Sequence, residues 1–264
     1  MKYLFDCWND FLELFYKARV VCMFFDYDGT LTPIVNKPEL AILPLQTKKL
    51  LSRLAKKRWS RLAIVSGRSL KNVKKLVGLK KVIYAGNHGL ELQGPRIKFT
   101  NKKAVAIRKC LDVIYDSLVD ELKGNPRILI EHKGLTLSVH YRLEKNKNKI
   151  NKVFKTVEQL TLSYVRKKAL RISHGKKVIE IKPRIDWNKG KVVLWLLKYF
   201  KQNKNSLSIY LGDDTTDEDA FRVLRNKGIG IFIGDPSKKK TQAKFYLRNT
   251  RQVADFLSKI VYKN

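Results

Sequence analysis

The sequence lacks the long hydrophobic runs of membrane proteins and of secretory signal peptides. No segment reaches the roughly 18 uncharged apolar residues that a membrane-spanning helix requires. The opening segment, MKYLFDCWND FLELFYKARV, carries Asp6, Asp10 and Glu13 where a signal peptide needs a clean apolar stretch. We therefore expect a globular protein of the cytoplasm with no membrane partner.

Cysteine is scarce as well, since only Cys7, Cys22 and Cys110 occur. They lie far apart, are odd in number and form no CxxC pair, so the spacing argues against a zinc ribbon or a redox motif. We expect reduced, structural thiols. The sequence also contains no internal repeat and no low-complexity tract.

Acidic residues are few compared with basic ones: 23 Asp and Glu stand against 56 Lys and Arg, a net charge of +33. Such an excess attracts phosphates, nucleic acid and anionic surfaces. The lysines are scattered, however, and in segments 48–58 and 71–81 they fall between leucines and valines at helical spacing. We interpret most of them as solvated helix faces. Nucleic acid is therefore not the expected partner, although a basic nucleic-acid-binding protein stays the alternative from another functional class.

The 264 residues, 44% of them hydrophobic, suffice for one large domain or for a core with a smaller second unit. Apolar runs predict buried parallel strands, and leucine periodicity predicts helices between them. Residues 1–19 are expected to form an amphipathic helix. The strands are expected at 20–25, 61–67, 81–86, 206–212, 228–234 and 244–249, with helices at 43–57, at 69–77 and from 215 onward. This order predicts an α/β fold with one doubly wound parallel sheet.

The middle of the chain has a different pattern. A helix is expected at 104–122 and another at 151–165, while 128–134, 135–142 and the hairpin at 170–183 alternate as antiparallel strands. Strands and helices without βαβ order predict a small α+β unit inserted into the sheet domain. We expect a core of residues 1–100 and 185–264 and an inserted unit of residues 101–184.

Polar residues gather where the predicted strands end. Asp26 and Asp28 follow the first strand directly, and open parallel sheets bind ligands at the carboxyl ends of their strands. Single explanations exist for each residue: an Asp-Gly turn, a helix cap, a surface lysine or an acidic helix start. Their coincidence at one sheet edge favours a catalytic site instead. The other members of this set are Ser66, Lys189, Asp213 and Asp214.

The motifs DYDGT, SGR and GDDTTDE, with Lys189 between the last two, resemble in this order the four motifs of the haloacid dehalogenase-like phosphohydrolase superfamily. More narrowly, FDYDGTLTPI, IVSGRSL, AGNHGLE and GDDTTDEDAF resemble the trehalose-6-phosphate phosphatase family over roughly residues 20–250. The resemblance implies a Rossmann-like core with an inserted cap. Two residues depart from the family pattern: Asn188 where many members have aspartate, and His132 where aspartate or asparagine is more usual.

The resemblance implies a Mg²⁺-dependent phosphomonoesterase. Asp26 would be the nucleophile that forms an aspartyl phosphate, and Asp28 would be the general acid and then the general base. Ser66 and Lys189 would help Mg²⁺ to neutralise the phosphate dianion. The expected metal ligands are Asp26, the carbonyl of Asp28, Asp213 and Asp214, with Asp214 or Asp217 holding waters around the ion.

The expected substrate is a small sugar phosphate, namely trehalose 6-phosphate at the last step of trehalose biosynthesis. By resemblance, the expected substrate contacts are Arg68, Asn87 and His88 in the core and Lys133, Arg142, Lys176 and Glu180 in the cap. Glu131 and His140 are either further contacts or members of an ordinary alternating strand. A sucrose-phosphate or mannosyl-phosphoglycerate phosphatase, and a scaffolding pseudo-enzyme, stay as alternatives. The pattern gives no oligomeric state.

Overall fold

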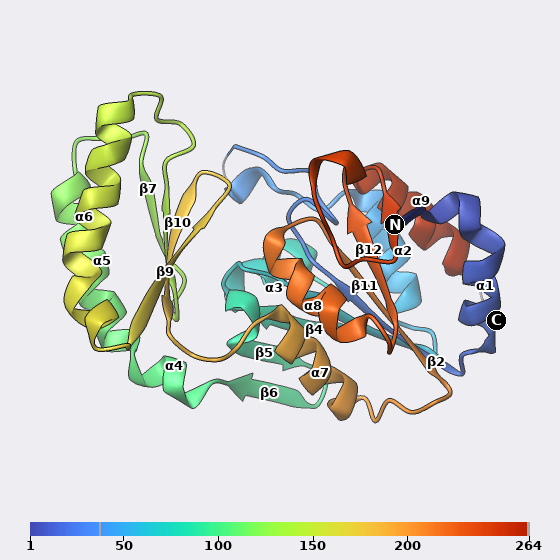
Figure 1. The fold of residues 1–264 in the computed structure, drawn as a ribbon. Helices are drawn as coiled ribbons and strands as arrows, with labels where there is room; N and C mark the ends of the chain where they lie inside the picture. The colour runs from blue at the N-terminus through green and yellow to red at the C-terminus, as the bar shows by residue number, and fades with distance from the viewer. Residues whose placement is uncertain (37, 263–264) are drawn as a thin grey trace. The chain divides into compact units, whose positions relative to one another are not determined.

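A computed structural model describes residues 1–36 and 38–262 of the chain (Figure 1). Contacts divide it into two compact units, which we describe separately: unit 1 is Met1–Phe99 with Trp187–Asn264, and unit 2 is Thr100–Asp186. Unit 2 is thus one continuous insertion into unit 1. That unit 1 is a catalytic core and unit 2 its cap stays a prediction.

Unit 1 is built on a mixed sheet whose strands follow the order β1-β13-β12-β11-β2-β3-β4-β5-β6. The strands from β1 to β4 in this order are parallel, and β5 is antiparallel to β4. Their bounds are β1 Lys2–Tyr3, β2 Val20–Phe25, β3 Ser60–Val65, β4 Ile83–Gly86, β5 Glu91–Gly94, β6 Ile97–Thr100, β11 Ser206–Gly212, β12 Ile229–Ile233 and β13 Phe245–Leu247.

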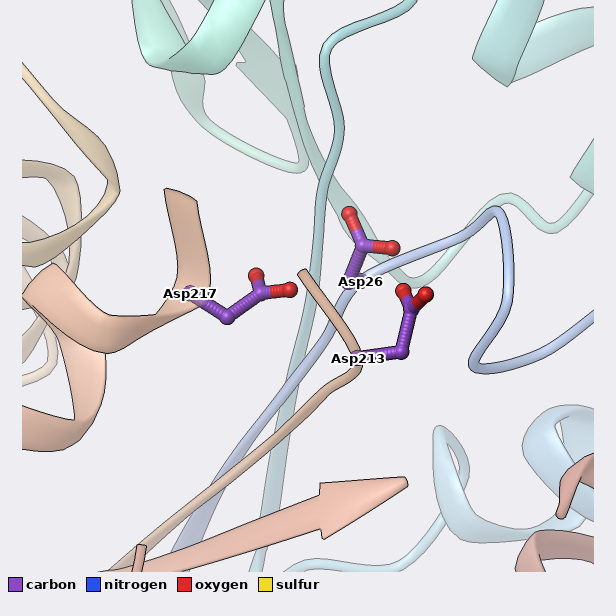
Figure 2. A group of neighbouring side chains, drawn as sticks. All are labelled: Asp26, Asp213 and Asp217. Carbon is purple, nitrogen blue, oxygen red and sulfur yellow. The ribbon is translucent and has the colours of Figure 1, made fainter. Parts of the chain in front are cut away.

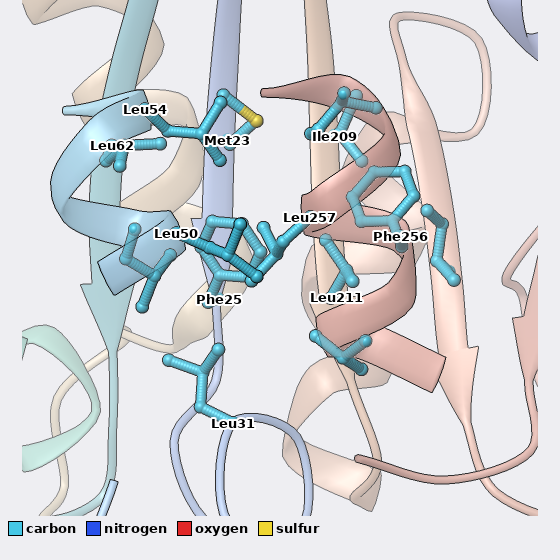
Figure 3. Close-up of a cluster of buried hydrophobic side chains, with 14 of the residues drawn as sticks. Met23, Phe25, Leu31, Leu50, Leu54, Leu62, Ile209, Leu211, Phe256 and Leu257 are labelled. Carbon is cyan, nitrogen blue, oxygen red and sulfur yellow. The ribbon is translucent and has the colours of Figure 1, made fainter. Parts of the chain in front are cut away.

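Helices cover both faces of this sheet, because strands such as β2 are apolar on both sides. Met23 and Phe25 of β2 enter one core with α1, α2, α3 and α9, whereas Cys22 and Phe24 enter a second core with α7 and α8. Figure 3 shows α2 and α9 side by side over the first core. The doubly wound α/β fold is therefore confirmed. The helices are α1 Trp8–Lys17, α2 Leu45–Leu54, α3 Leu70–Val77, α7 Lys189–Tyr199, α8 Glu218–Leu224 and α9 Thr250–Ile260, with 3-10 turns η1 Leu4–Cys7, η2 Pro38–Leu40, η3 Asn87–Gly89, η4 Thr215–Asp217 and η5 Pro236–Lys238.

Unit 2 is an α+β unit, as its sequence pattern indicates. Its antiparallel sheet has the order β7-β8-β10-β9, and apolar residues such as Val139 and Ile179 pack against its helices. The opposite sheet face carries Glu131, Ser138 and Glu180, which lie side by side in the strand register. The bounds are α4 Lys102–Ala106, α5 Arg108–Leu122, β7 Leu129–His132, β8 Leu137–His140, α6 Lys147–Arg166, β9 Leu170–Gly175 and β10 Val178–Pro183.

Three details differ from the sequence-based expectation. Residues 1–19 are not one helix, because Lys2 and Tyr3 pair with β13 and Leu4–Cys7 form a 3-10 turn before α1. The expected helix at 104–122 begins as α4 and is interrupted at Ile107. The hairpin of β5 and β6 was not predicted. Over the described positions, no helix is both long and apolar enough to cross a bilayer.

Candidate active site

Two neighbouring strands bring together the acids that follow them. Phe25 of β2 pairs with Leu211 of β11, and the backbone N–H of Asp26 donates to the carbonyl of Leu211 at 2.9 Å. Asp26 and Asp213 therefore leave the sheet next to each other, and both are buried, with exposed fractions of 5% and 8%. The acids separated by most of the chain meet at the carboxyl edge of the sheet, as predicted from the strand ends.

Lys189, at the first turn of α7, joins this acidic pair. Its Nζ donates to Oδ1 of Asp26 at 2.6 Å and to Oδ1 of Asp217 at 2.7 Å. The phenol of Tyr210 also donates to Oδ1 of Asp217, at 2.6 Å. Figure 2 shows the carboxylates of Asp26, Asp213 and Asp217 turned toward one another from the ends of β2 and β11 and from η4. Three acids and one buried cation thus form a compact network.

Burial sets the electrostatics of the network. It is the largest cause that raises the pKa of Asp26 well above its ordinary value, and the neighbouring carboxylates add to it against the pull of Lys189. Burial alone would lower the pKa of Lys189, but the two carboxylates that it contacts outweigh burial and raise it. Burial and the Asp217 carboxylate raise the pKa of Tyr210, so this phenol keeps its proton and donates. The cluster holds more carboxylates than cations and favours a further positive group.

The oxygen atoms of the cluster fit a hard divalent cation. One oxygen from each of Asp26, Asp213 and Asp217 lies within 4.8 Å of the others, and Mg²⁺ prefers carboxylate and carbonyl oxygens. Asp217 is already engaged, because Oδ1 accepts from Lys189 and Tyr210 and Oδ2 accepts from the backbone N–H of Asp214. Asp26 and Asp213 are therefore the side chains best placed to hold an ion, while Asp217 holds the lysine.

The turn after Asp26 needs its glycine. Gly29 has φ +85°, and a Cβ at this position would overlap the carboxylate of Asp213. The backbone N–H of Gly29 donates to the carbonyl of Thr32 at 2.7 Å, which closes the turn. The D-x-D-G sequence thus lets the acidic loop after β11 approach the end of β2.

Asp28 is held by Arg68, the residue expected to contact substrate. The guanidinium donates from Nε to Oδ2 at 2.7 Å and from Nη2 to Oδ1 at 2.6 Å, a two-point grip on the carboxylate. Arg68 is 7% exposed, whereas the Asp28 side chain is 40% exposed. The pair fixes Asp28 at the mouth of the site while leaving it accessible.

The loops after β3 and β4 form the neighbouring wall. The backbone N–H of His88 donates to the carbonyl of Ser66 at 2.9 Å, and that of Asn87 donates to the carbonyl of Arg68 at 2.7 Å. Ser66 and Asn87 are buried, and Nδ2 of Asn87 donates to Glu91 at 2.6 Å. His88 has φ +54°, and its ring lies against Gly67. Ser66, Asn87 and His88 are thus placed together beside the strand end that carries Asp26.

Unit 2 gathers a second set of predicted residues on the polar face of its sheet. Nζ of Lys133 lies 3.8 Å from Glu131 and 3.9 Å from Glu180, and Nζ of Lys182 lies 2.5 Å from Glu180. Burial lowers the pKa of Lys182, partly offset by Glu180. Nε2 of His140 lies 3.3 Å from Glu131. We call Glu131, Lys133, Glu180 and Lys182 the cap cluster.

The cap cluster does not include every predicted cap residue. Arg142 donates to the backbone carbonyl of Lys176 at 2.7 Å, so these two lie together at the β9–β10 turn. Two hydroxyls flank Glu180 in the register, those of Ser138 and Ser173. Both are buried, and neither has a hydrogen-bond partner among residues 1–36 and 38–262.

Comparison with known proteins identifies the family. Residues 24–251 match the family model described as trehalose-phosphatase. The chain belongs to the trehalose-phosphatase family. The resemblance found in its motifs is thereby confirmed.

Members of the trehalose-phosphatase family are similar to this chain over most of its length. It is 35% identical to a probable trehalose-phosphate phosphatase 4 of Oryza sativa subsp. japonica, over 93% of this chain and 67% of that protein. It is 36% identical to a trehalose-phosphate phosphatase of Mycobacterium bovis, over 92% of this chain and 62% of that protein. The C-terminal domain of the C. albicans trehalose-6-phosphate phosphatase superposes with a TM-score of 0.80 at 26% identity, covering 96% of each chain.

Asp214 belongs to the GDDTTDE motif but does not join the carboxylate cluster of Asp26, Asp213 and Asp217. Its side chain accepts the backbone N–H of Thr215 at 2.7 Å and caps η4. The structure places Asp217 at the cluster instead. The reason is local: the 3-10 turn that begins after Asp214 directs the carboxylate three residues later back to the strand end.

Tyr210 was missed by the sequence-based reasoning, because it lies within the apolar run of β11. A signal existed. A phenol in a fully buried strand requires a hydrogen-bond partner, and GDD follows only two residues later. Lys182 was missed for another reason: it lies on the polar face of the alternating strand β10, where a lysine is ordinarily a solvent-exposed residue.

Proposed function

We propose that this protein hydrolyses trehalose 6-phosphate to trehalose and phosphate, as the last step of trehalose synthesis in the cytoplasm. Membership of the trehalose-phosphatase family supports the substrate. The main observation in support of the chemistry is the buried contact between Asp26 and Lys189. Asp213 lies next to this contact, and the nearby Asp28 side chain is accessible.

Asp26 acts as the nucleophile. One of its oxygens bonds Lys189 and the other can attack phosphorus, giving an aspartyl phosphate and splitting one displacement into two. Asp26, Asp213 and the carbonyl of Asp28 would hold Mg²⁺, whose positive charge would lower the repulsion between the carboxylate and the phosphate. Lys189 contributes a second, permanent positive charge, and Asp217 and Tyr210 fix its position.

Asp28 transfers the protons. It protonates the sugar oxygen as the bond to phosphorus breaks, and it then accepts a proton from the water that hydrolyses the aspartyl phosphate. The two-point contact with Arg68 orients this carboxylate. Ser66, on the adjacent strand end, donates its hydroxyl to a phosphate oxygen.

The cap cluster supplies the sugar contacts, together with Arg142 and Lys176. Paired carboxylates and ammonium groups accept from and donate to vicinal hydroxyls. On the core side, Asn87 and His88 line the approach to Asp26.

Phosphate release from a panel of sugar phosphates tests this proposal. Purified protein with Mg²⁺ is assayed on trehalose 6-phosphate, glucose 6-phosphate, sucrose 6-phosphate and mannosyl-3-phosphoglycerate. The highest kcat/KM is expected for trehalose 6-phosphate. A preference for sucrose 6-phosphate or mannosyl-3-phosphoglycerate would assign the chain to a related sugar phosphatase, and no release from any substrate would indicate a non-catalytic member. Addition of EDTA should abolish release, and Mg²⁺ should restore it.

A further inference from the structure

The amino edge of the sheet, opposite the catalytic edge, concentrates positive charge. The connections that enter β2, β3, β4, β11 and β12 all reach this edge, because the strands are parallel. The turn between β5 and β6 reaches it too, since β5 is antiparallel to β4. These connections, and the helix and strand ends beside them, carry a set of cations that we call the amino-edge strip. Its members are Lys17, Arg19, Lys56, Lys57, Arg58, Arg61, Lys80, Lys81, Arg96, Lys198, Lys201, Lys204, Arg225 and Lys227.

Hydrogen bonds join several segments of the strip, and the strand order places the others beside them. The N–H of Arg19 donates to the carbonyl of Asn205 at 2.8 Å, and the N–H of Val21 donates to the carbonyl of Trp59 at 2.7 Å. The hydroxyl of Tyr199 lies 3.2 Å from the carbonyl of Arg96. At about 4.8 Å per strand, the row from β12 to β5 spans roughly 24 Å.

Acidic residues are absent from the strip segments. None of the segments 17–19, 56–61, 80–81, 198–204 and 225–227 contains Asp or Glu, whereas Asp26, Asp213 and Asp217 lie at the opposite edge. All strip cations except Lys57 have exposed side chains. Glu13, one turn earlier in α1, pairs with Lys17. A strand of six residues at about 3.3 Å each separates the strip from the catalytic edge by roughly 20 Å, so the strip does not serve the substrate phosphate.

The cations at 56–58 and 80–81, expected on helix faces, lie beyond the ends of α2 and α3. Contrary to the expectation from sequence, we propose that the amino-edge strip binds the phosphate backbone of single-stranded nucleic acid. A linear row of cations matches a linear polyanion, in which phosphates repeat along one direction. Tyr16 and Tyr199, with exposed fractions of 57% and 39%, flank the strip and offer rings on which bases can stack. This surface lies outside the proposed phosphatase site and is independent of it.

An anionic membrane fits the strip less well. Membrane-surface binding combines cations with apolar side chains that enter the lipid. Two exposed aliphatic side chains, Leu14 and Leu194, lie one helical turn before Lys17 and Lys198. Among the described residues, the loop segments of the strip themselves contain no large exposed aliphatic side chain. The hydroxyl of Tyr199 bonds the carbonyl of Arg96 and its ring stacks on Trp195, so this tyrosine offers bases its exposed ring surface rather than its hydroxyl.

Fluorescence anisotropy with the full-length protein tests the proposal. The probes are labelled single-stranded DNA and RNA of about 20 nucleotides, longer than one typical site, titrated between about 50 and 200 mM KCl. The strip variant combines Lys56→Ala, Arg58→Ala, Lys80→Ala and Lys204→Ala. The control variant removes the same charge from unit 2 by Lys145→Ala, Lys147→Ala, Lys152→Ala and Lys155→Ala, all at exposed positions.

The strip variant should bind at least about tenfold more weakly, and its salt slope should fall by about 0.7 for each phosphate that the variant no longer neutralises. The control variant should stay within about threefold of the unmodified protein. Both variants should keep the phosphatase activity, which also reports on folding. Equal weakening of the two variants would overturn the proposal, as would absence of binding by the unmodified protein at about 150 mM salt. Tighter binding to phosphatidylserine vesicles than to either oligonucleotide would assign the strip to membranes instead.

Discussion

Replacement of Lys189 by methionine tests the electrostatics of the candidate site most directly. Lys189 is 3% exposed and contacts two carboxylates at 2.6 and 2.7 Å, so its loss leaves Asp26 and Asp217 buried without their cation. Removal of one partner of a buried ion pair typically costs about 3 to 5 kcal/mol. Methionine keeps the length and apolar volume of the side chain, so the cost comes mainly from charge.

Protonation sets an upper limit to this cost. The variant can relieve its excess negative charge by protonating one aspartate. A pH of 7.5 is about 3.6 units above the ordinary pKa of aspartate. At about 1.4 kcal/mol per unit, this costs about 5 kcal/mol. A carboxyl whose pKa is raised on folding destabilises the protein fully above its folded pKa, and the destabilisation decreases as pH falls below the folded pKa toward the unfolded value. At pH 5.5 the loss should therefore be about 2 to 3 kcal/mol smaller.

Thermal unfolding in EDTA, followed by circular dichroism, measures the effect. For a protein of this size, 1 kcal/mol corresponds to about 2 to 4 °C, so Lys189→Met should lower Tm by roughly 6 to 20 °C at pH 7.5. Lys198→Met, at an exposed position of the same helix, should change Tm by less than about 2 °C. Added Mg²⁺ should raise the Tm of Lys189→Met more than that of the unmodified protein, because it replaces the missing charge. A Lys189→Met protein that melts within about 2 °C of the unmodified protein in EDTA would refute the reasoning.

Three further predictions concern single residues. Asp26→Asn should reduce kcat by at least about a thousandfold with an unchanged circular dichroism spectrum, and appreciable residual turnover would contradict a covalent step at Asp26. Ser138→Ala should raise Tm slightly, because its buried hydroxyl has no partner among the described residues and its desolvation is not repaid; a clear fall in Tm would show that the hydroxyl is hydrogen-bonded. Hydrogen bonds from the Asn146 N–H, the Asn125 side chain and the Lys145 N–H lower the pKa of Glu144. Glu144→Gln should therefore lower Tm at pH 7, and the difference should shrink as pH falls below about 4.5; a constant difference would exclude this carboxylate as its source.

Much of the sheet could be predicted because its central strands are apolar on both faces. Segments such as VVCMFF leave little choice of secondary structure, and the strand ends then locate Asp26 and Asp213. Strand β1 could not be predicted in this way. Its two residues depend on pairing with Phe245 and Tyr246 at the other end of the chain, a long-range contact without a local signature.

The side-chain network of the site could not be predicted from the sequence either, because its contacts are also long-range. Lys189 reaches Asp26 across 163 positions and Asp217 across 28, and no spacing rule indicates which of several acids a lysine will contact. The choice between Asp214 and Asp217 depends on the 3-10 turn that begins between them. The sequence alone does not show where this turn begins, so it does not show which of the two carboxylates faces Asp26.

The insertion of unit 2 also has a consequence for synthesis on the ribosome. Strand β2 lies between β3, made soon afterwards, and β11, which begins only at Ser206. At about 5 to 20 residues per second, roughly 180 residues of translation leave one edge of β2 without its neighbour for about 9 to 36 s. Unit 2 is one continuous segment and can fold during this interval, whereas the N-terminal part of unit 1 still lacks β11. During that interval the open hydrophobic edge is the part of the chain most in need of a chaperone.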